Sequence, residues 1–210
     1  LMKYKWLNKH QNNNIIVFFN GWGMDESVVH HLDFSDYDVV MFYDYNNLET
    51  DFDFSSLKEY RNKSLIAWSM GVMVATLFDK IEYNTTTAIN GTLKPIDNDF
   101  GIPQRIYDLT IRGFNEKGAQ RFIKSMFNEE IELPQISRDI ENQKSELSAL
   151  KNYTANSNFK YNRIILSDND KIIPTKNQVA FWGIEPNISS GHCPFMLFKK
   201  WEELLWWTKN

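Results

Sequence analysis

The stretch Ser64-Leu-Ile-Ala-Trp-Ser-Met-Gly-Val72 decides the fold of this 210-residue chain. An apolar run of strand length leads into Ser69, and a helical pattern begins after Gly71. Such a strand, tight turn and helix exposes a serine hydroxyl at the carboxyl edge of a sheet, and small flanking residues let the helix pack closely. Ala67 stands where this turn usually has its first glycine and is small enough to keep it. We therefore interpret Ser69 as a nucleophile rather than as part of an incidental Ser-x-Gly.

Further apolar, β-branched runs of strand length occur on both sides of this stretch, with helical patterns between them. The predicted strands are Ile15–Phe19, Asp38–Phe42, Ser64–Trp68, Thr87–Asn90 and Arg163–Leu166, with a weaker one at Ile184–Ile188. The predicted helices between and after them are Glu26–Leu32, Met70–Ile81, Thr175–Phe181 and Pro194–Trp207. Nearly continuous apolar strands alternating with helices indicate an α/β fold, in which helices cover both faces of a mostly parallel sheet.

Between Gly91 and Tyr161 the pattern changes to amphipathic helices without a convincing strand. The helices predicted there are Ile106–Phe114, Gly118–Phe127 and Gln135–Leu150. We expect residues 91–160 to form a helical cap inserted before the acid-bearing strand, over a core made of residues 2–90 and 161–210. A segment of this size would struggle to bury a core of its own, so we expect a single domain.

Composition narrows the class of protein. The chain is 42% hydrophobic and has 15 Phe, 9 Tyr and 7 Trp, which excludes global disorder. Its net charge of −4 disfavours nucleic-acid binding, which draws on a basic excess. No window approaches about 18 uninterrupted apolar residues, and the first ten residues lack the apolar core of a signal peptide. We expect a cytoplasmic monomer without membrane contact.

The single cysteine, Cys193, has no partner for an internal disulfide, and with four histidines it forms no spaced cluster for zinc. We expect no metal and no organic cofactor. Cys193 follows directly on His192, which raises the alternative of a thiol mechanism. We interpret it instead as a small buried side chain that fills space in the core.

A serine hydroxyl needs a base to take its proton, and the base needs an acid to fix its tautomer. Asp168 and Asp170 follow the strand that ends at Leu166, and His192 lies in a loop of small residues before the final helix. The order serine, acid, histidine is typical of α/β-hydrolases. We prefer Asp170 as the acid, with Asp168 as the alternative. His192 as an ordinary surface histidine is the competing interpretation.

An acyl-transfer site also needs two donors for the oxyanion. The amide after the nucleophile, that of Met70, is the first candidate. The turn Gly21-Trp22-Gly23 ends the strand Ile15–Phe19 and offers the Trp22 amide as the second, and we expect the Trp22 ring to wall the acyl channel. The alternative is an ordinary glycine turn with a core tryptophan. A phosphate-binding loop is disfavoured, because neither Gly-x-Gly-x-x-Gly nor the Walker lysine pattern is present.

Taken together, these motifs resemble a known family. The matching segments are Asn20–Met24, Ala67–Val72, Asn90–Thr92, Gly101–Pro103, Asp170–Pro174 and Gly191–Phe195. The whole chain resembles the BioG type of pimeloyl-[acyl-carrier protein] methyl ester esterases of biotin synthesis, and it shares the serine, histidine and Gly-Trp-Gly elements with the larger BioH type. The resemblance implies an α/β-hydrolase fold, a triad of Ser69, Asp170 and His192, and oxyanion amides at Trp22 and Met70. It also implies the substrate, a methyl-capped C7 acyl chain tethered by phosphopantetheine to an acidic acyl-carrier protein.

The predicted cap has a local basic excess that suits an acidic carrier. Between Gln104 and Ser125 there are two acidic residues against the bases Arg105, Arg112, Lys117, Arg121 and Lys124. Arginine is the better partner for phosphate, because its guanidinium donates two parallel hydrogen bonds. An ordinary solvated helix face explains the same cluster.

Two other functions remain open at this point. A general carboxylesterase or thioesterase would act on small acyl esters without a carrier protein. A catalytically silent hydrolase-like binding protein would keep the fold without turnover.

Overall fold

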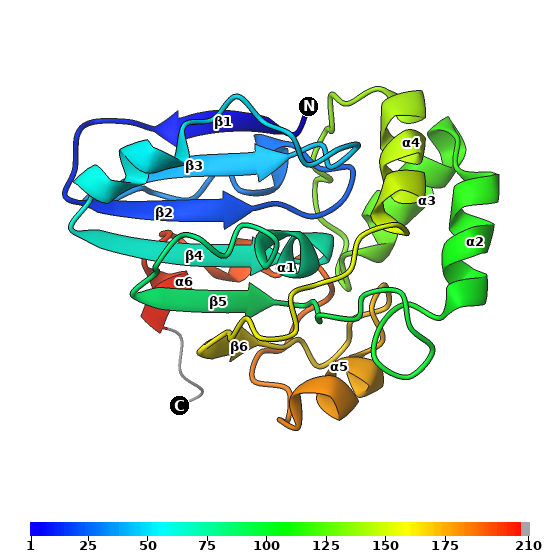
Figure 1. The fold of residues 1–210 in the computed structure, drawn as a ribbon. Coiled ribbons are helices and arrows are strands. Elements are labelled where there is room, and N and C mark those ends of the chain that lie inside the picture. The colour runs from blue at the N-terminus through cyan, green and yellow to red at the C-terminus, as the bar shows by residue number, and fades with distance from the viewer. Residues whose placement is uncertain (207–210) are drawn as a thin grey trace.

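The computed structural model describes residues 1–206, in which six strands form one sheet. The strands are β1 (Lys3–Asn8), β2 (Asn14–Phe19), β3 (Tyr37–Tyr43), β4 (Asn62–Trp68), β5 (Thr85–Ile89) and β6 (Arg163–Ile165). Their order across the sheet is β1-β3-β2-β4-β5-β6, and all neighbours are parallel except β1 and β3. The parallel strands therefore end at one common edge, on the right of Figure 1.

The sheet is buried on both faces. Successive side chains of a strand point to opposite faces, so Val17 and Phe19 of β2 join one apolar cluster and Ile16 and Phe18 join the other. Helix α1 (Met70–Ala75) belongs to the first cluster. Helix α6 (Glu203–Trp206) contributes buried leucines to the second. The two-sided cover explains why these strands are apolar without alternation.

The predicted parallel strands are confirmed with one exception. Five of them overlap β2 to β6, but the strand at Ile184–Ile188 is wrong, because Ile188 forms only an isolated bridge with Ser167. Pro186 lacks the N–H that a ladder needs, and the Asn187 side chain accepts the Leu166 amide instead of leaving it to a neighbouring strand.

The edge strand β1 has no counterpart among the predicted strands. Its sequence alternates between polar and aromatic residues, which is the pattern of a strand with one exposed face: Lys3 and Lys5 are exposed, and Tyr4 and Trp6 are partly buried.

Several predicted helices are shorter than expected. Met70–Ile81 is helical only to Ala75, Glu26–Leu32 is only the 3-10 turn η1 (Glu26–Val28), and a further turn, η2 (Phe54–Glu59), precedes β4. Pro194–Trp207 resolves into the turn η3 (Phe195–Leu197) and helix α6, and its predicted end at Trp207 lies outside the described residues. Most of the apolar side chains in this segment are nonetheless buried. The apolar pattern therefore predicted correctly that the segment packs against the core, although it does not form one continuous helix. Helix α5 (Thr175–Trp182) is confirmed.

Three further helices overlap the predictions for residues 91–160. They are α2 (Gln104–Gly113), α3 (Glu116–Ser125) and α4 (Ile140–Leu150). Asn115 and Asp139 cap α3 and α4 by accepting hydrogen bonds from the amides of Gly118 and Asn142. All three helices lie beyond the carboxyl ends of the parallel strands (Figure 1). Across residues 1–206, no helix combines the length and apolar character needed to cross a membrane.

The turn between β4 and α1 depends on close backbone packing. Ser69 has a positive φ of 58°, which non-glycine residues rarely adopt. A Cβ on Gly71 would lie 2.4 Å from the carbonyl oxygen of Phe19, at the end of β2. The helix can therefore start directly after Ser69 only because Gly71 carries no side chain.

We expect Gly71→Ala to destabilise the protein by about 3 kcal/mol or to prevent soluble expression, because the clash is with backbone and no side chain can move aside. Gly113→Ala is the matched control. A Cβ at that helical position meets nothing within 4 Å, so this change should be neutral or stabilise by up to about 1 kcal/mol. Urea unfolding of both variants measures the difference, and equal free energies of unfolding would contradict this account of the turn.

Candidate active site

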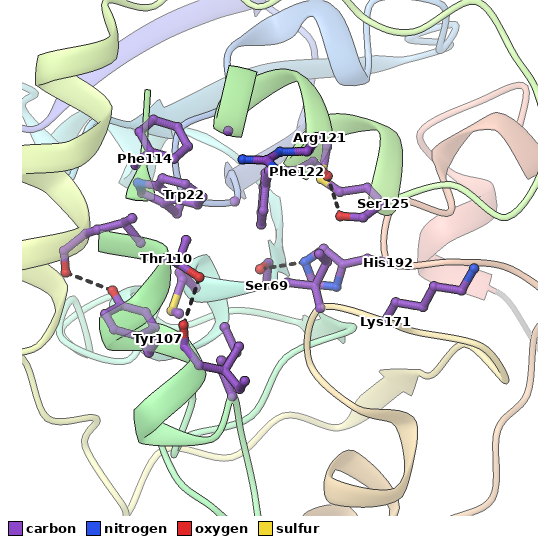
Figure 2. A pocket seen from close by; sticks show the side chains of 18 of the residues that line it. Trp22, Ser69, Tyr107, Thr110, Phe114, Arg121, Phe122, Ser125, Lys171 and His192 are labelled. Atoms are coloured by element: carbon purple, nitrogen blue, oxygen red, sulfur yellow. Dashed lines mark hydrogen bonds between the residues drawn. The ribbon is translucent and has the colours of Figure 1, made fainter. Parts of the chain in front are cut away.

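Ser69, His192 and Asp170 meet at the carboxyl edge of the sheet. The Nε2 atom of His192 lies 2.8 Å from the Ser69 hydroxyl oxygen, and Nδ1 lies 2.7 Å from Oδ2 of Asp170. In the tautomer that this arrangement requires, Nδ1–H donates to the carboxylate and Nε2 accepts from the serine. All three residues are buried, and Figure 2 shows the serine hydroxyl joined to the adjacent imidazole by a hydrogen bond.

Only one of the two candidate acids contacts the histidine. Asp170 also accepts hydrogen bonds from the amides of Ile172 and Ile173 and from the side chain of Gln178. Asp168 is exposed, and its carboxylate accepts the Ser190 amide instead. The geometry therefore favours Asp170 as the partner of the imidazole.

Two residues that the sequence analysis did not assign to the site hold the histidine loop. The side-chain amide of Asn90 donates to the carbonyl of His192 at 2.9 Å and to the hydroxyl of Ser167 at 2.8 Å, and its oxygen accepts the Ser167 amide. The indole N–H of Trp68 donates to the same His192 carbonyl at 2.8 Å. Asn90 thus joins the loop that carries Asp170 to the loop that carries His192. A sequence signal existed, because Asn90 is an amide side chain at the carboxyl end of a predicted strand.

The two residues whose amides are predicted to bind the oxyanion line the same cavity as the serine. Met70 is the first residue of α1, and the first N–H groups of a helix have no acceptor within it. Within residues 1–206, the Trp22 amide donates to no protein acceptor. Gly21, Trp22, Ser69 and Met70 all line the same cavity. Both N–H groups are thus available to a ligand bound at Ser69.

The Trp22 ring has two roles in the structure. It lines the cavity, as expected from the sequence, and it packs edge-on against Phe114 and Phe122. Its indole N–H donates to the carbonyl of Gln143 in α4 at 2.7 Å. The ring therefore also ties the loop after β2 to α4.

The cavity has a volume of about 460 Å³ and is lined mainly by apolar side chains. Most of these side chains come from residues 91–160, in α2, α3 and α4 and the segments beside them, and include Ile106, Tyr107, Leu109, Phe114, Phe122 and Leu147. Arg121 and Lys171 supply its cationic groups (Figure 2). Both basic residues are exposed, so the cavity combines a mainly apolar wall with positive charge that is accessible to solvent.

The structure divides the predicted basic cluster. Lys117, Arg121 and Lys124 follow one face of α3 and line a second hollow, which meets the Ser69 cavity at Arg121. Arg105 and Arg112 are exposed on α2 and line neither space. In the described part of the chain, none of these five bases forms an ion pair within 4.0 Å. Their charge is therefore available to a partner.

Cys193 is buried in the apolar cluster behind the sheet. Burial raises the pKa of its thiol to about 12. A thiol is nucleophilic only as the thiolate, so this environment favours the interpretation of Cys193 as a core side chain.

Comparison with known proteins places this geometry in a family. Residues 2–204 match the family model described as pimeloyl-ACP methyl esterase BioG. The crystal structure of BioG from Haemophilus influenzae superposes with a TM-score of 0.87 at 30% identity, covering 97% of this chain and all of that one. An uncharacterized protein from H. influenzae is 31% identical over 97% of this chain and 99% of its own length.

Two further relatives mark the limits of the likeness. A malonyl-[acyl-carrier protein] O-methyltransferase from Bacteroides fragilis is 36% identical over 80% of this chain, but the chain spans only 36% of that protein's length. An α/β-hydrolase fold protein from Burkholderia ambifaria has a TM-score of 0.55 at 14% identity, covering 92% of this chain and 88% of that one, which supports the fold alone. The family match over nearly the whole chain is the finding that identifies the protein: it belongs to the BioG family of pimeloyl-ACP methyl esterases, and it is a carboxylic ester hydrolase with the α/β-hydrolase fold.

Proposed function

We propose that this esterase cleaves the methyl ester of pimeloyl-ACP through a serine-linked acyl-enzyme, with Ser69 as nucleophile, His192 as base and Asp170 as its partner. The observation that carries the proposal is the continuous hydrogen-bonded chain from the Ser69 hydroxyl through His192 to Asp170, beside an apolar cavity. A buried serine held at 2.8 Å from an imidazole nitrogen is poised for proton transfer during attack.

The proposed reaction has two halves. The Ser69 oxygen attacks the ester carbonyl while Nε2 of His192 takes the hydroxyl proton, and Asp170 stabilises the imidazolium. The amides of Trp22 and Met70 donate to the oxyanion. When the intermediate collapses, the ester C–O bond breaks and methanol leaves with the proton from His192. A water then attacks the acyl-enzyme, with His192 again as base, and releases the free ω-carboxylate and Ser69.

We propose that residues 91–160 act as a cap over a core of residues 2–90 and 161–210. This segment supplies most of the apolar residues that line the cavity, and its helices α2, α3 and α4 lie beyond the sheet edge that carries Ser69. The cap would thus select the acyl chain, while the core would supply the chemistry.

We further propose that the basic face of α3 receives the carrier protein. Arg121 borders both the Ser69 cavity and the basic hollow, so a phosphate at the opening would meet its guanidinium while the acyl arm reaches the serine. Lys117 and Lys124 extend the positive surface away from the opening. Arg105 and Arg112 would add longer-range attraction from α2 without bordering the cavity. Such contacts should raise the encounter rate more than they change the chemical step.

Substitutions in the triad test the mechanism. We expect Ser69→Ala and His192→Ala each to lower kcat by at least about 10⁴-fold, because the members act as a unit. Asp170→Asn should cost about 10³- to 10⁴-fold, since it removes the acceptor that fixes the imidazole tautomer. Asp168→Asn should change kcat by less than about threefold. Steady-state hydrolysis of a short p-nitrophenyl ester measures all four, and a crippled Asp168→Asn variant would show that the acid is wrongly assigned.

The thiol alternative has its own test. At pH 8 the Cys193 thiol should stay protonated, because its pKa of about 12 lies well above that of an ordinary cysteine, about 8.5. Iodoacetamide should therefore leave folded protein unlabelled and fully active, but label it in guanidinium chloride. Rapid labelling of the folded protein, with loss of activity that tracks the labelling, would overturn the core role of Cys193.

Carrier binding is tested by comparing two substrates. We expect Arg121→Glu to lower kcat/KM for the carrier-bound methyl ester at least about tenfold, and Arg112→Glu to lower it less, because only Arg121 borders the cavity. The wild-type advantage should fall as added salt shortens the Debye length from about 10 to 3 Å. Hydrolysis of a small neutral methyl ester should change neither with these substitutions nor with added salt. Lys58→Glu, an exposed lysine in η2, is the control for net charge.

Equal losses on both substrates would mean that Arg121 maintains the cap rather than contacting a carrier. A wild-type enzyme that hydrolyses the free ester as fast as the carrier-bound one would favour a general carboxylesterase.

A further inference from the structure

The loop that carries Trp22 is held by a buried carboxylate outside the sheet. The side chain of Glu146, in α4, accepts the amide hydrogen of Gly23 on Oε2 at 3.2 Å. Glu146 is completely buried. A buried carboxylate is stable only when its oxygens are paired and hydrogen-bonded, so this contact restrains both partners.

The remaining partners of Glu146 connect it to the neighbouring loop. Its Oε1 accepts the Tyr45 amide at 2.9 Å, and Arg138 lies 2.7 Å from Oε2 in an ion pair. The Tyr45 hydroxyl in turn donates to the carbonyl of Asn20, just before the Trp22 loop. One carboxylate thus joins α4 to the loops that follow β2 and β3.

A second residue of α4, one helical turn before Glu146, also binds the Trp22 loop. Gln143 lies three residues before Glu146 and accepts the indole N–H of Trp22 on its carbonyl. The Trp22 amide sits between two glycines, of which Gly23 has a positive φ of 73°. The Gly21 carbonyl, which belongs to the same peptide group as the Trp22 N–H, accepts the Met24 amide at a long 3.4 Å. Because glycines on both sides leave this backbone with few steric restraints, contacts from outside the loop add to that weak internal one in setting the direction of the Trp22 N–H.

We infer that Glu146 is a positioning residue for the oxyanion site: by holding the Gly23 amide, it aims the Trp22 N–H at the place where negative charge develops on the substrate. The inference rests on the proposed role of the Trp22 amide. No residue of the triad contacts Glu146, so its influence on the reaction passes through the loop.

The test compares Glu146→Gln with Asp44→Asn. Both changes remove a buried carboxylate from Arg138, since Asp44 lies 3.5 Å from the same guanidinium, but Asp44 does not contact Gly23. Glu146→Asp is the second variant. This variant keeps the negative charge but shortens the side chain by one methylene, which withdraws the carboxylate from the loop. If Glu146→Gln does not fold, Glu146→Asp carries the test. Thermal unfolding reports the fold of each protein.

The decisive measurement compares the binding of two inhibitors, an alkyl trifluoromethyl ketone and the matching methyl ketone. The carbonyl carbon of the trifluoromethyl ketone adds the Ser69 oxygen, and its carbonyl oxygen becomes an oxyanion. In Glu146→Gln and Glu146→Asp we expect kcat/KM for a short ester to fall about ten- to hundredfold, somewhat less than loss of a donor. Ki for the trifluoromethyl ketone should rise by a similar factor, because a misplaced donor weakens oxyanion binding. Affinity for the methyl ketone should not change, and Asp44→Asn should stay within about threefold of wild type in every assay.

Three results would overturn the inference. The first is a pair of folded Glu146 variants with wild-type kcat/KM. The second is a loss of activity in which both ketones weaken equally, which would mean general loosening of the cavity. The third is an equal loss in Asp44→Asn. A wild-type enzyme that the trifluoromethyl ketone does not inhibit would instead refute the serine mechanism itself, and this inference with it.

Discussion

Backbone contact between the start of α1 and the end of β2 governs the geometry of the whole site. The space that a Cβ on Gly71 would occupy is taken by the carbonyls of Phe19 and Asn20. Because the helix packs this closely, β4 must turn into α1 at a single residue, and Ser69 takes up the strain of a positive φ. The same turn presents the hydroxyl at the sheet edge and leaves the Met70 amide, as the first of the helix, without an acceptor in α1.

The parallel sheet then gathers the other parts of the site. Strands β2, β4, β5 and β6 all end at this edge, and the chain leaves them through the Trp22 turn, Ser69, Asn90 and the Asp170 loop respectively. Asn90 is placed between the loops of Asp170 and His192, so its single side-chain amide joins two loops that both lie more than 75 residues further along the chain. A rigid sheet with short connections positions such groups more accurately than long loops would.

Buried carboxylates order the loops around this edge in the same way three times. Asp170 contacts His192 and accepts hydrogen bonds from two backbone amides. Glu146 accepts hydrogen bonds from the amides of Gly23 and Tyr45, and Asp25 accepts them from the amides of Ser27 and Ser137. Burial alone would raise the pKa of Asp25, but the hydrogen bonds from both serines hold it below its ordinary value. An ionised carboxylate out of water needs several donors, so each one draws separate segments together.

The sequence by itself determined the alternation of buried strands and helices, the candidates Ser69, Asp170 and His192, and the candidate oxyanion turn at Trp22, because each depends on local spacing or on chain order. It left Asp168 beside Asp170 as an open alternative and overextended the helix after Ser69. Only the tertiary structure decided which acid faces the imidazole, which of the bases on α2 and α3 border the cavity, and that Asn90 and Glu146 hold loops of the site. The physical reason is that these contacts join residues from 22 to 123 positions apart in the sequence. Their energy comes from burial and hydrogen-bond geometry that appear only once the sheet has assembled.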